Sequence, residues 1–297
     1  MRKIACTLVM AGVMATPSMA QDSATQSQTA VSGTAAAAAP AAPADAAAQA
    51  PPEATAPKRV VVTTGFDFAT AYMFRGIYQE DSGTIAPAYA DIGVNLDRGV
   101  TLNFGNWSSL HSGPSGHGGH GNAWYEADYY GSATFTAGKL KPGVLFTSYT
   151  SPNDVFATVY ELAGVLAYDD SSTPFPLSPK AIVGFELGDG QADGGSNKGT
   201  YLELGIKPAL KAAPKLTVYV PVKVGLSLKD YYEGPTGSNR FGYFDTGLIA
   251  SVPLAFMGGS WEAHGGVDFM WLGDNMALLN SGDDFKPVGI IGLSFTY

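Results

Sequence analysis

Acidic side chains recur along the chain at positions that alternate with apolar residues. Successive residues of a β-strand face opposite sides, so these acids would share one side of a sheet. If that sheet closes into a barrel, the charged side faces the interior, or lumen. The predicted lumen-lining acids are Asp67, Asp91, Glu126, Asp128, Glu161, Glu186, Glu203, Asp245, Glu262 and Asp268, and the lysines on the same side are Lys207, Lys223 and Lys229.

An interior with so many more acids than lysines would concentrate cations, because rings of one charge sign attract counter-ions. The pattern therefore predicts passage of small polar or cationic solutes. A closed barrel, whose interior charges pair with one another, is the alternative that the sequence leaves open.

Three histidines lie in one glycine-rich segment: His111, His117 and His120. Neutral imidazoles so close in sequence can bind Zn²⁺ or Cu²⁺. The glycines make the segment costly to order. We therefore expect a flexible surface loop, with neither a metal nor another cofactor.

The remaining histidine, His264, faces inward by parity, beside Glu262 and Asp268. The sequence has no Gly-x-Ser-x-Gly motif of the kind that presents a nucleophilic serine on a sharp turn. Paired carboxylates can carry out acid–base catalysis, but carboxylates also line barrel interiors without doing so. We expect no enzyme.

Composition narrows the class of protein. Only 14% of the 297 residues are charged, against about 25% in soluble domains. The aromatic content of 11% is too high for a disordered chain. Because the net charge is −9 and the basic residues are scattered, we expect no nucleic-acid partner.

The first 58 residues are predicted to lie outside the fold. Residues 1–20 have a basic start, an apolar stretch and a small residue at the end, as in a secretory signal peptide. Residues 21–58 are rich in Ala and Pro and predict a disordered periplasmic tether. The one cysteine, Cys6, lies in the predicted signal peptide, so disulfides and thiolate metal sites are not expected in the mature chain.

From residue 59 to 297 the apolar pattern has a period of two, which indicates strands with one side in an apolar medium. Trp261 and Trp271 are ten residues apart on the apolar side, as are Tyr125 and Phe135. Along strands tilted by about 45° this spacing is about 24 Å, close to the height of the apolar band of an outer-membrane barrel. The predicted aromatic girdle consists of Tyr125, Phe135, Trp261, Trp271, Phe295 and Tyr297.

Twelve segments show this alternation: 60–74, 85–96, 100–109, 123–137, 143–150, 155–168, 180–188, 199–210, 215–229, 240–254, 260–272 and 286–297. Long connectors and short turns alternate between them, as in an up-and-down barrel. The connector 151–154 is short where a loop is expected, and 169–179 is long where a turn is expected. Ten or fourteen strands therefore remain open, and Pro221 interrupts a predicted strand.

Two segments resemble known proteins. Ile291, Leu293, Phe295 and Tyr297 alternate at the C-terminus, which resembles the closing strand of Gram-negative outer-membrane proteins. This resemblance implies recognition by the barrel-assembly machinery. Residues 72–79, together with 92–96 and 103–107, resemble the opening of the uncharacterised family called Gcw_chp. That likeness covers roughly fifty residues and implies no catalytic residues.

The sequence thus predicts an all-β, transmembrane, up-and-down antiparallel barrel of about twelve strands in the cell outer membrane, with both termini periplasmic. Its expected partners are outer-membrane lipid, the assembly machinery and small solutes or ions. A closed barrel that acts through its loops or tether is one alternative function, and a secreted soluble β-protein is another.

Overall fold

The computed structural model describes residues 59–117, 122–235, 237–255 and 260–297. The predicted signal peptide and tether lie outside these residues. Within them, no helix is both long enough and apolar enough to span a membrane.

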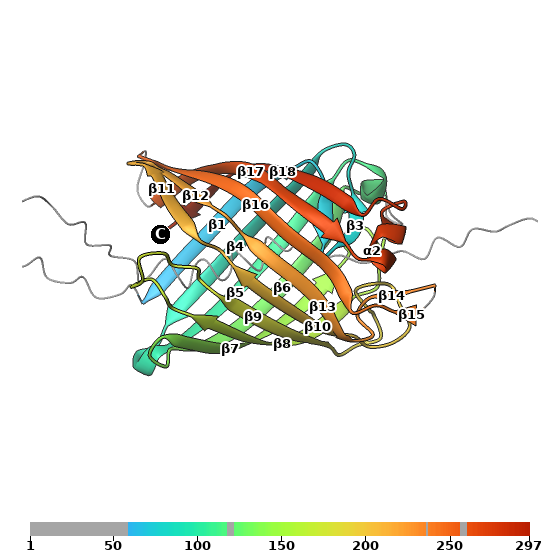
Figure 1. Cartoon of the computed structure of the whole chain (residues 1–297), viewed down its shortest axis with the longest axis horizontal. Helices are drawn as coiled ribbons and strands as arrows, with labels where there is room; N and C mark the ends of the chain where they lie inside the picture. The colour runs from blue at the N-terminus through green and yellow to red at the C-terminus, as the bar shows by residue number, and fades with distance from the viewer. Residues whose placement is uncertain (1–58, 118–121, 236, 256–259) are drawn as a thin grey trace, which may run out of the picture.

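A closed antiparallel β-barrel of twelve wall strands forms the fold (Figure 1). Each strand pairs with the next, and the last pairs with the first. The wall consists of β1 (Val60–Ala69), β4 (Ile85–Asn95), β5 (Val100–His111), β6 (Trp124–Phe135), β7 (Leu140–Thr150), β8 (Val159–Tyr168), β9 (Lys180–Glu186), β10 with β11 (Thr200–Ile206 and Ala209–Ala213), β12 with β13 (Leu216–Tyr219 and Val222–Lys229), β16 (Phe241–Leu254), β17 (Ser260–Leu272) and β18 (Phe285–Thr296). The predicted fold class and strand number are confirmed.

Two wall strands are interrupted at prolines without losing register. Val220 donates its N–H to Pro208 O at 3.0 Å, and Pro221 O accepts the N–H of Gly247 at 3.1 Å. Pairing with β16 keeps one register on both sides of Pro221. Proline removes one ladder hydrogen bond at each site, and the neighbouring pairs hold the strand in line.

The ladder registers fix the width of the barrel. Following the paired residues from Thr63 once around the wall leads back to the line of the first strand 16 residues further along, which is the shear number of the barrel. With about 3.3 Å per residue and 4.8 Å between strands, the tilt is about 43° and the backbone diameter about 25 Å. Such an interior has room for more than the side chains of the wall.

Alternation along each strand separates the two sides of the wall. On β8, Tyr160, Leu162 and Leu166 are exposed on the outside, whereas Glu161 and Ala163 are buried. A continuous apolar exterior with polar groups inside is the arrangement of outer-membrane barrels.

Short turns lie at one end of the barrel and longer connectors at the other, which we call the turn end and the loop end. The C-terminus lies at the turn end (Figure 1). The loop end carries the two-stranded sheet β14 (Glu233–Gly234) and β15 (Gly237–Ser238) and the helix α2 (Asp274–Leu279). The connector 169–179 has its predicted length, whereas the connector predicted as 151–154 extends over 151–158 because β8 begins at Val159. No strand is miscounted, and the ten- and fourteen-strand alternatives are wrong.

The first wall strand is shorter than the predicted segment 60–74. It ends at Ala69, and β2 (Tyr72–Phe74) and β3 (Ile77–Glu80) form a separate hairpin. Tyr72, Phe74 and Ile77 are all buried. The chain therefore turns into the barrel at its loop end, and we call this hairpin the plug.

Candidate functional site

The turn of the plug has a conformation that its sequence favours. Arg75 and Gly76 are its two central residues, with φ of 44° and 84°. Two-residue hairpin turns of type I′ need positive φ at both positions, which glycine adopts readily. A side chain on Gly76 would also lie 2.9 Å from Cβ of Tyr243 on the wall.

Arg75 joins the plug to the wall. Its guanidinium donates to both carboxylate oxygens of Glu161 on β8, at 2.6 and 2.9 Å. It also donates to Tyr231 Oη at 2.7 Å and lies 4.0 Å from the ring centroid of Tyr201. Arg75 and Glu161 are only 1% and 2% exposed. A buried bidentate pair between a guanidinium and a carboxylate is the strong form of this interaction, although Nε of Arg75 has no hydrogen-bond partner among the described residues.

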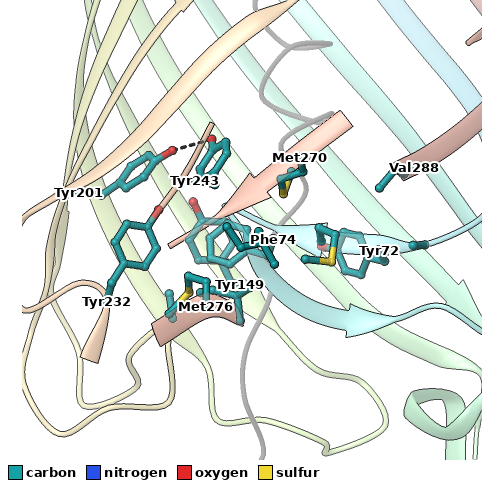
Figure 2. Packing of buried hydrophobic residues seen from close by; sticks show 14 of the residues in the cluster. Tyr72, Phe74, Tyr149, Tyr201, Tyr232, Tyr243, Met270, Met276 and Val288 are labelled. Carbon is teal, nitrogen blue, oxygen red and sulfur yellow. Dashed lines mark hydrogen bonds between the residues drawn. The ribbon is translucent and has the colours of Figure 1, made fainter. Parts of the chain in front are cut away.

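Tyrosines belong to the buried cluster at the loop end, and Figure 2 shows Tyr201, Tyr232 and Tyr243 close together in it. Tyr201 and Tyr243 both donate to Glu203 Oε2, at 2.7 and 2.9 Å. Tyr232, from the connector after β13, donates to Arg75 O at 3.0 Å. Met276 of α2 is completely buried in the same cluster. The plug and the two connectors thus close the loop end together.

The opposite side of the plug is tied to β5 and β6. Tyr72 donates to Glu126 Oε2 at 2.7 Å and stacks on Trp107 with 5.5 Å between ring centroids. Glu80 accepts hydrogen bonds from Ser82 and Ser115. Burial raises the pKa of Glu80, but these hydrogen bonds outweigh it and the pKa lies below its ordinary value.

A second carboxylate at the loop end has the opposite shift. Asp193 accepts the backbone N–H groups of Gly195 and Glu233, at 2.8 and 2.6 Å. Burial is the largest influence and raises the pKa of Asp193 to about 6. This connector therefore carries less charge in mild acid than at neutral pH.

Most of the predicted lumen-lining residues are buried within the barrel. Eight acids and one lysine are less than 9% exposed: Asp67, Asp91, Glu126, Asp128, Glu161, Glu186, Glu203, Asp245 and Lys223. Glu262, Asp268 and Lys207 are half-buried, and Lys229 is exposed at the loop end. The structure brings Glu161 and Glu203 to the plug together with Glu126.

A second group lies in the half of the barrel nearer the turn end. It lines a cavity of about 90 Å³. Asp67 on β1 and His264 on β17 point toward each other inside the barrel, with 2.8 Å between Oδ1 of Asp67 and Nε2 of His264. Other lining side chains are Lys207, Lys223, Glu262 and Asp268, which mix both charge signs. Polar space thus continues below the plug.

The girdle prediction is wrong for Tyr125, which is 1% exposed. The β5–β6 register shifts so that Ser109 pairs with Glu126 and Leu110 with Trp124. Tyr125 is the extra residue of this bulge, which reverses the parity on one side of it. Trp124 faces outward in its place, with 42% exposure.

The other predicted girdle residues lie on the outside to different degrees. Phe135, Trp271 and Tyr297 are exposed. Trp261 and Phe295 are half-buried and pack together with 4.8 Å between ring centroids.

The histidine segment is not a flexible loop at its first residue. His111 ends β5, is 1% exposed and stacks on Tyr125. Its ring nitrogens lie 2.8 Å from Ser109 Oγ and 2.6 Å from Ser115 Oγ. His117 bonds Gly113 O, and His120 lies outside the described residues. Within the described part of the chain, no group of three or more potential ligands could hold a metal ion.

Sequence reasoning missed Arg75, Tyr231 and Tyr232 as parts of the site. One signal was present, because Arg75-Gly76 directly follows the predicted first strand, and glycine favours the positive φ of a tight turn. The two adjacent tyrosines lie in a connector, where no periodicity indicates an inward direction.

Comparisons with known proteins return outer-membrane barrels among solved structures. The COG4313 outer membrane channel from Pseudomonas putida F1 has a TM-score of 0.46 at 8% identity, over 84% of this chain and 100% of that one. The NanC porin has 0.44 at 10% over 80% and 98%, and LpxR from Salmonella typhimurium has 0.41 at 11% over 78% and 99%. No protein-family model and no curated protein matches the chain, so the resemblance to the Gcw_chp family has no further support.

Proposed function

We propose that the protein is a narrow outer-membrane channel that prefers small cations, and that its plug closes the loop end in the resting state. The observation that carries this proposal is the acidic lumen of a closed barrel with an apolar exterior. Eight buried acids of the wall stand against one buried lysine and the plug arginine. Both chain ends would then lie on the periplasmic side, where an exported chain leaves its N-terminal tether.

The width of the barrel supports a path for solutes once the plug moves. A backbone diameter of about 25 Å leaves roughly 15 Å between the wall side chains, since each layer of side chains occupies about 5 Å. The plug and the tyrosine cluster fill this space at the loop end. Polar space remains nearer the turn end, so displacement of the plug is the step that conduction requires.

Planar-bilayer recording of the full chain tests the proposal. We expect brief, small openings and a reversal potential in a KCl gradient that shows cation preference. The variant Arg75→Ala, which loosens the plug, should open more often with the same preference. Anion preference in either protein would contradict the proposed selectivity.

A closed interaction barrel is the second candidate function, and the extent of packing at the loop end favours it. If neither the wild-type chain nor Arg75→Ala conducts, although both show the heat-dependent gel shift of a folded barrel, this second function replaces the channel.

A further inference from the structure

Exposed charges differ between the two ends of the barrel. The turn end presents five exposed basic side chains: Arg59, Arg98, Lys139, Lys211 and Lys215. We call them the basic collar. The loop end presents six exposed aspartates alongside three exposed basic residues: Asp81, Asp154, Asp189, Asp274, Asp283 and Asp284, with Lys198, Lys229 and Arg240.

The acids described at the turn end are engaged elsewhere. Asp169 pairs with Lys141 at 3.1 Å. Asp170 is buried and accepts the N–H groups of Leu177 and Ser178, at 2.6 and 3.0 Å. Glu262 lines the internal cavity. The basic collar therefore keeps its positive charge available to an external partner.

Exposed apolar residues adjoin the collar along the chain. Val60 follows Arg59, Leu140 follows Lys139, and Leu210 precedes Lys211, each with 46–50% of its surface exposed. Phe175, in the nearby connector 169–179, is 77% exposed. An apolar residue next to a long basic one is typical of a membrane interface, where the first enters the acyl region and the second reaches the headgroups.

The placement of the collar distinguishes among partners. Its residues come from the start of β1, from the β4–β5 and β6–β7 turns and from the β11–β12 hairpin, which lie around the rim. A folded protein docked on one side would meet only some of them. A lipid leaflet surrounds the barrel and meets all of them.

We propose that the basic collar binds the phosphate groups of anionic phospholipids in the leaflet at the turn end. Each collar residue would pair with a lipid phosphate while its apolar neighbour contacts the acyl chains. The attraction is electrostatic, so it weakens at high salt. The inference depends on the membrane-spanning barrel and not on conduction, because a permanently closed barrel would keep the same collar.

Lipid competition with the full-length protein tests the proposal. Phosphatidylglycerol and phosphatidylethanolamine with identical acyl chains are supplied in equal amounts, and retained lipids are counted by native mass spectrometry. The collar variant Arg98→Gln/Lys211→Gln/Lys215→Gln is compared with a loop-end control, Lys198→Gln/Lys229→Gln/Arg240→Gln. Both variants remove the same net charge, and the heat-dependent gel shift verifies that each is folded.

We expect the wild-type protein and the control to retain phosphatidylglycerol preferentially. The collar variant should lose at least tenfold of this preference, since one basic residue near an anionic surface changes binding about fivefold. Raising the salt before exchange should reduce the preference of the wild type. Equal retention of the two lipids by the wild type, or equal losses in both variants, would overturn the proposal.

Discussion

Replacing Arg75 by alanine should release the plug, because this side chain makes the ion pair between the hairpin and the wall. It removes two hydrogen bonds to Glu161, one to Tyr231 and the contact with the Tyr201 ring. Truncating one member of a buried ion pair costs about 3–5 kcal/mol, since the partner charge is left uncompensated. Because about 1.4 kcal/mol is a factor of ten, a loss of about 4 kcal/mol lowers the ratio of closed to open plug roughly a thousandfold.

Single-channel recording and hydrogen exchange measure the two sides of this prediction. The open probability should rise, and the amides of residues 72–80 should lose protection while those of the wall strands keep theirs. Arg240→Ala is the matched control, since this arginine is exposed at the same end of the barrel. It should leave both measurements unchanged.

A double variant separates the missing arginine from the unpaired Glu161. Replacing both partners of a buried pair by apolar residues of similar size is often neutral, so Arg75→Met/Glu161→Met should restore most of the closure and the protection. If Arg75→Ala retains wild-type protection at residues 72–80, the plug is held by other contacts and the reasoning is wrong.

Three further predictions concern the turn of the plug, an ion pair at the turn end and the acids of the lumen. Gly76→Val should loosen the plug by at least about 1–2 kcal/mol, because the new side chain combines a positive φ with a contact of 2.9 Å to Tyr243. Gly138→Val is the control for backbone strain alone, since Gly138 has φ of 63° and no atom within 4 Å of the added Cβ. Equal hydrogen exchange at residues 72–80 in the two variants would contradict this reasoning. Hydrogen bonds from the Ser171 hydroxyl and from Lys141 lower the pKa of Asp169 to about 2. The Asp169 carboxylate therefore stabilises the fold by about 1 kcal/mol after solvent screening above about pH 4, and this contribution is lost as the pH falls through 2. The urea midpoints of the wild type and Asp169→Asn should differ at pH 6 and converge near pH 2. Asp91→Asn/Asp128→Asn should reduce the cation preference of an open Arg75→Ala channel, whereas neutralising the exposed Asp283 and Asp284 should change it less, and an unchanged reversal potential in the first variant would separate selectivity from these lumen acids.

The wall was predictable because its signal is local. Each strand repeats one apolar and one polar position, and a strand that must present both sides correctly has one register. Tyr125 shows where this logic fails, since one bulge residue reverses the parity and nothing in the sequence near Trp124 indicates it. His111 shows a second limit. Its glycine-rich neighbours predicted a loop, whereas the ladder with β4, which pairs Ile85 with His111, extends the strand that far.

The plug was not predictable by the same means, because its partners are distant in the sequence. Arg75 meets Glu161 on β8 and Tyr231 in the connector after β13, residues that the closed barrel brings to one height. Sequence parity places Glu161 in the lumen, but not opposite an arginine. The two-residue turn at Arg75-Gly76 is the local feature that allows the chain to reverse inside the barrel.

The buried ion pair fixes the position of the plug, but it does not stabilise the closed plug more than apolar contacts of similar size would. Apolar contacts alone would bury the hairpin at less desolvation cost, and replacement of such pairs by apolar residues is often stabilising. A bidentate pair instead fixes one orientation, since the fork of Arg75 fits Glu161 only when the turn lies against β8. The net contribution of the pair to the stability of the closed plug is small, and its main effect is to fix the position of the turn. A plug held in this way has one defined closed position, and the proposed channel requires in addition that it can be displaced.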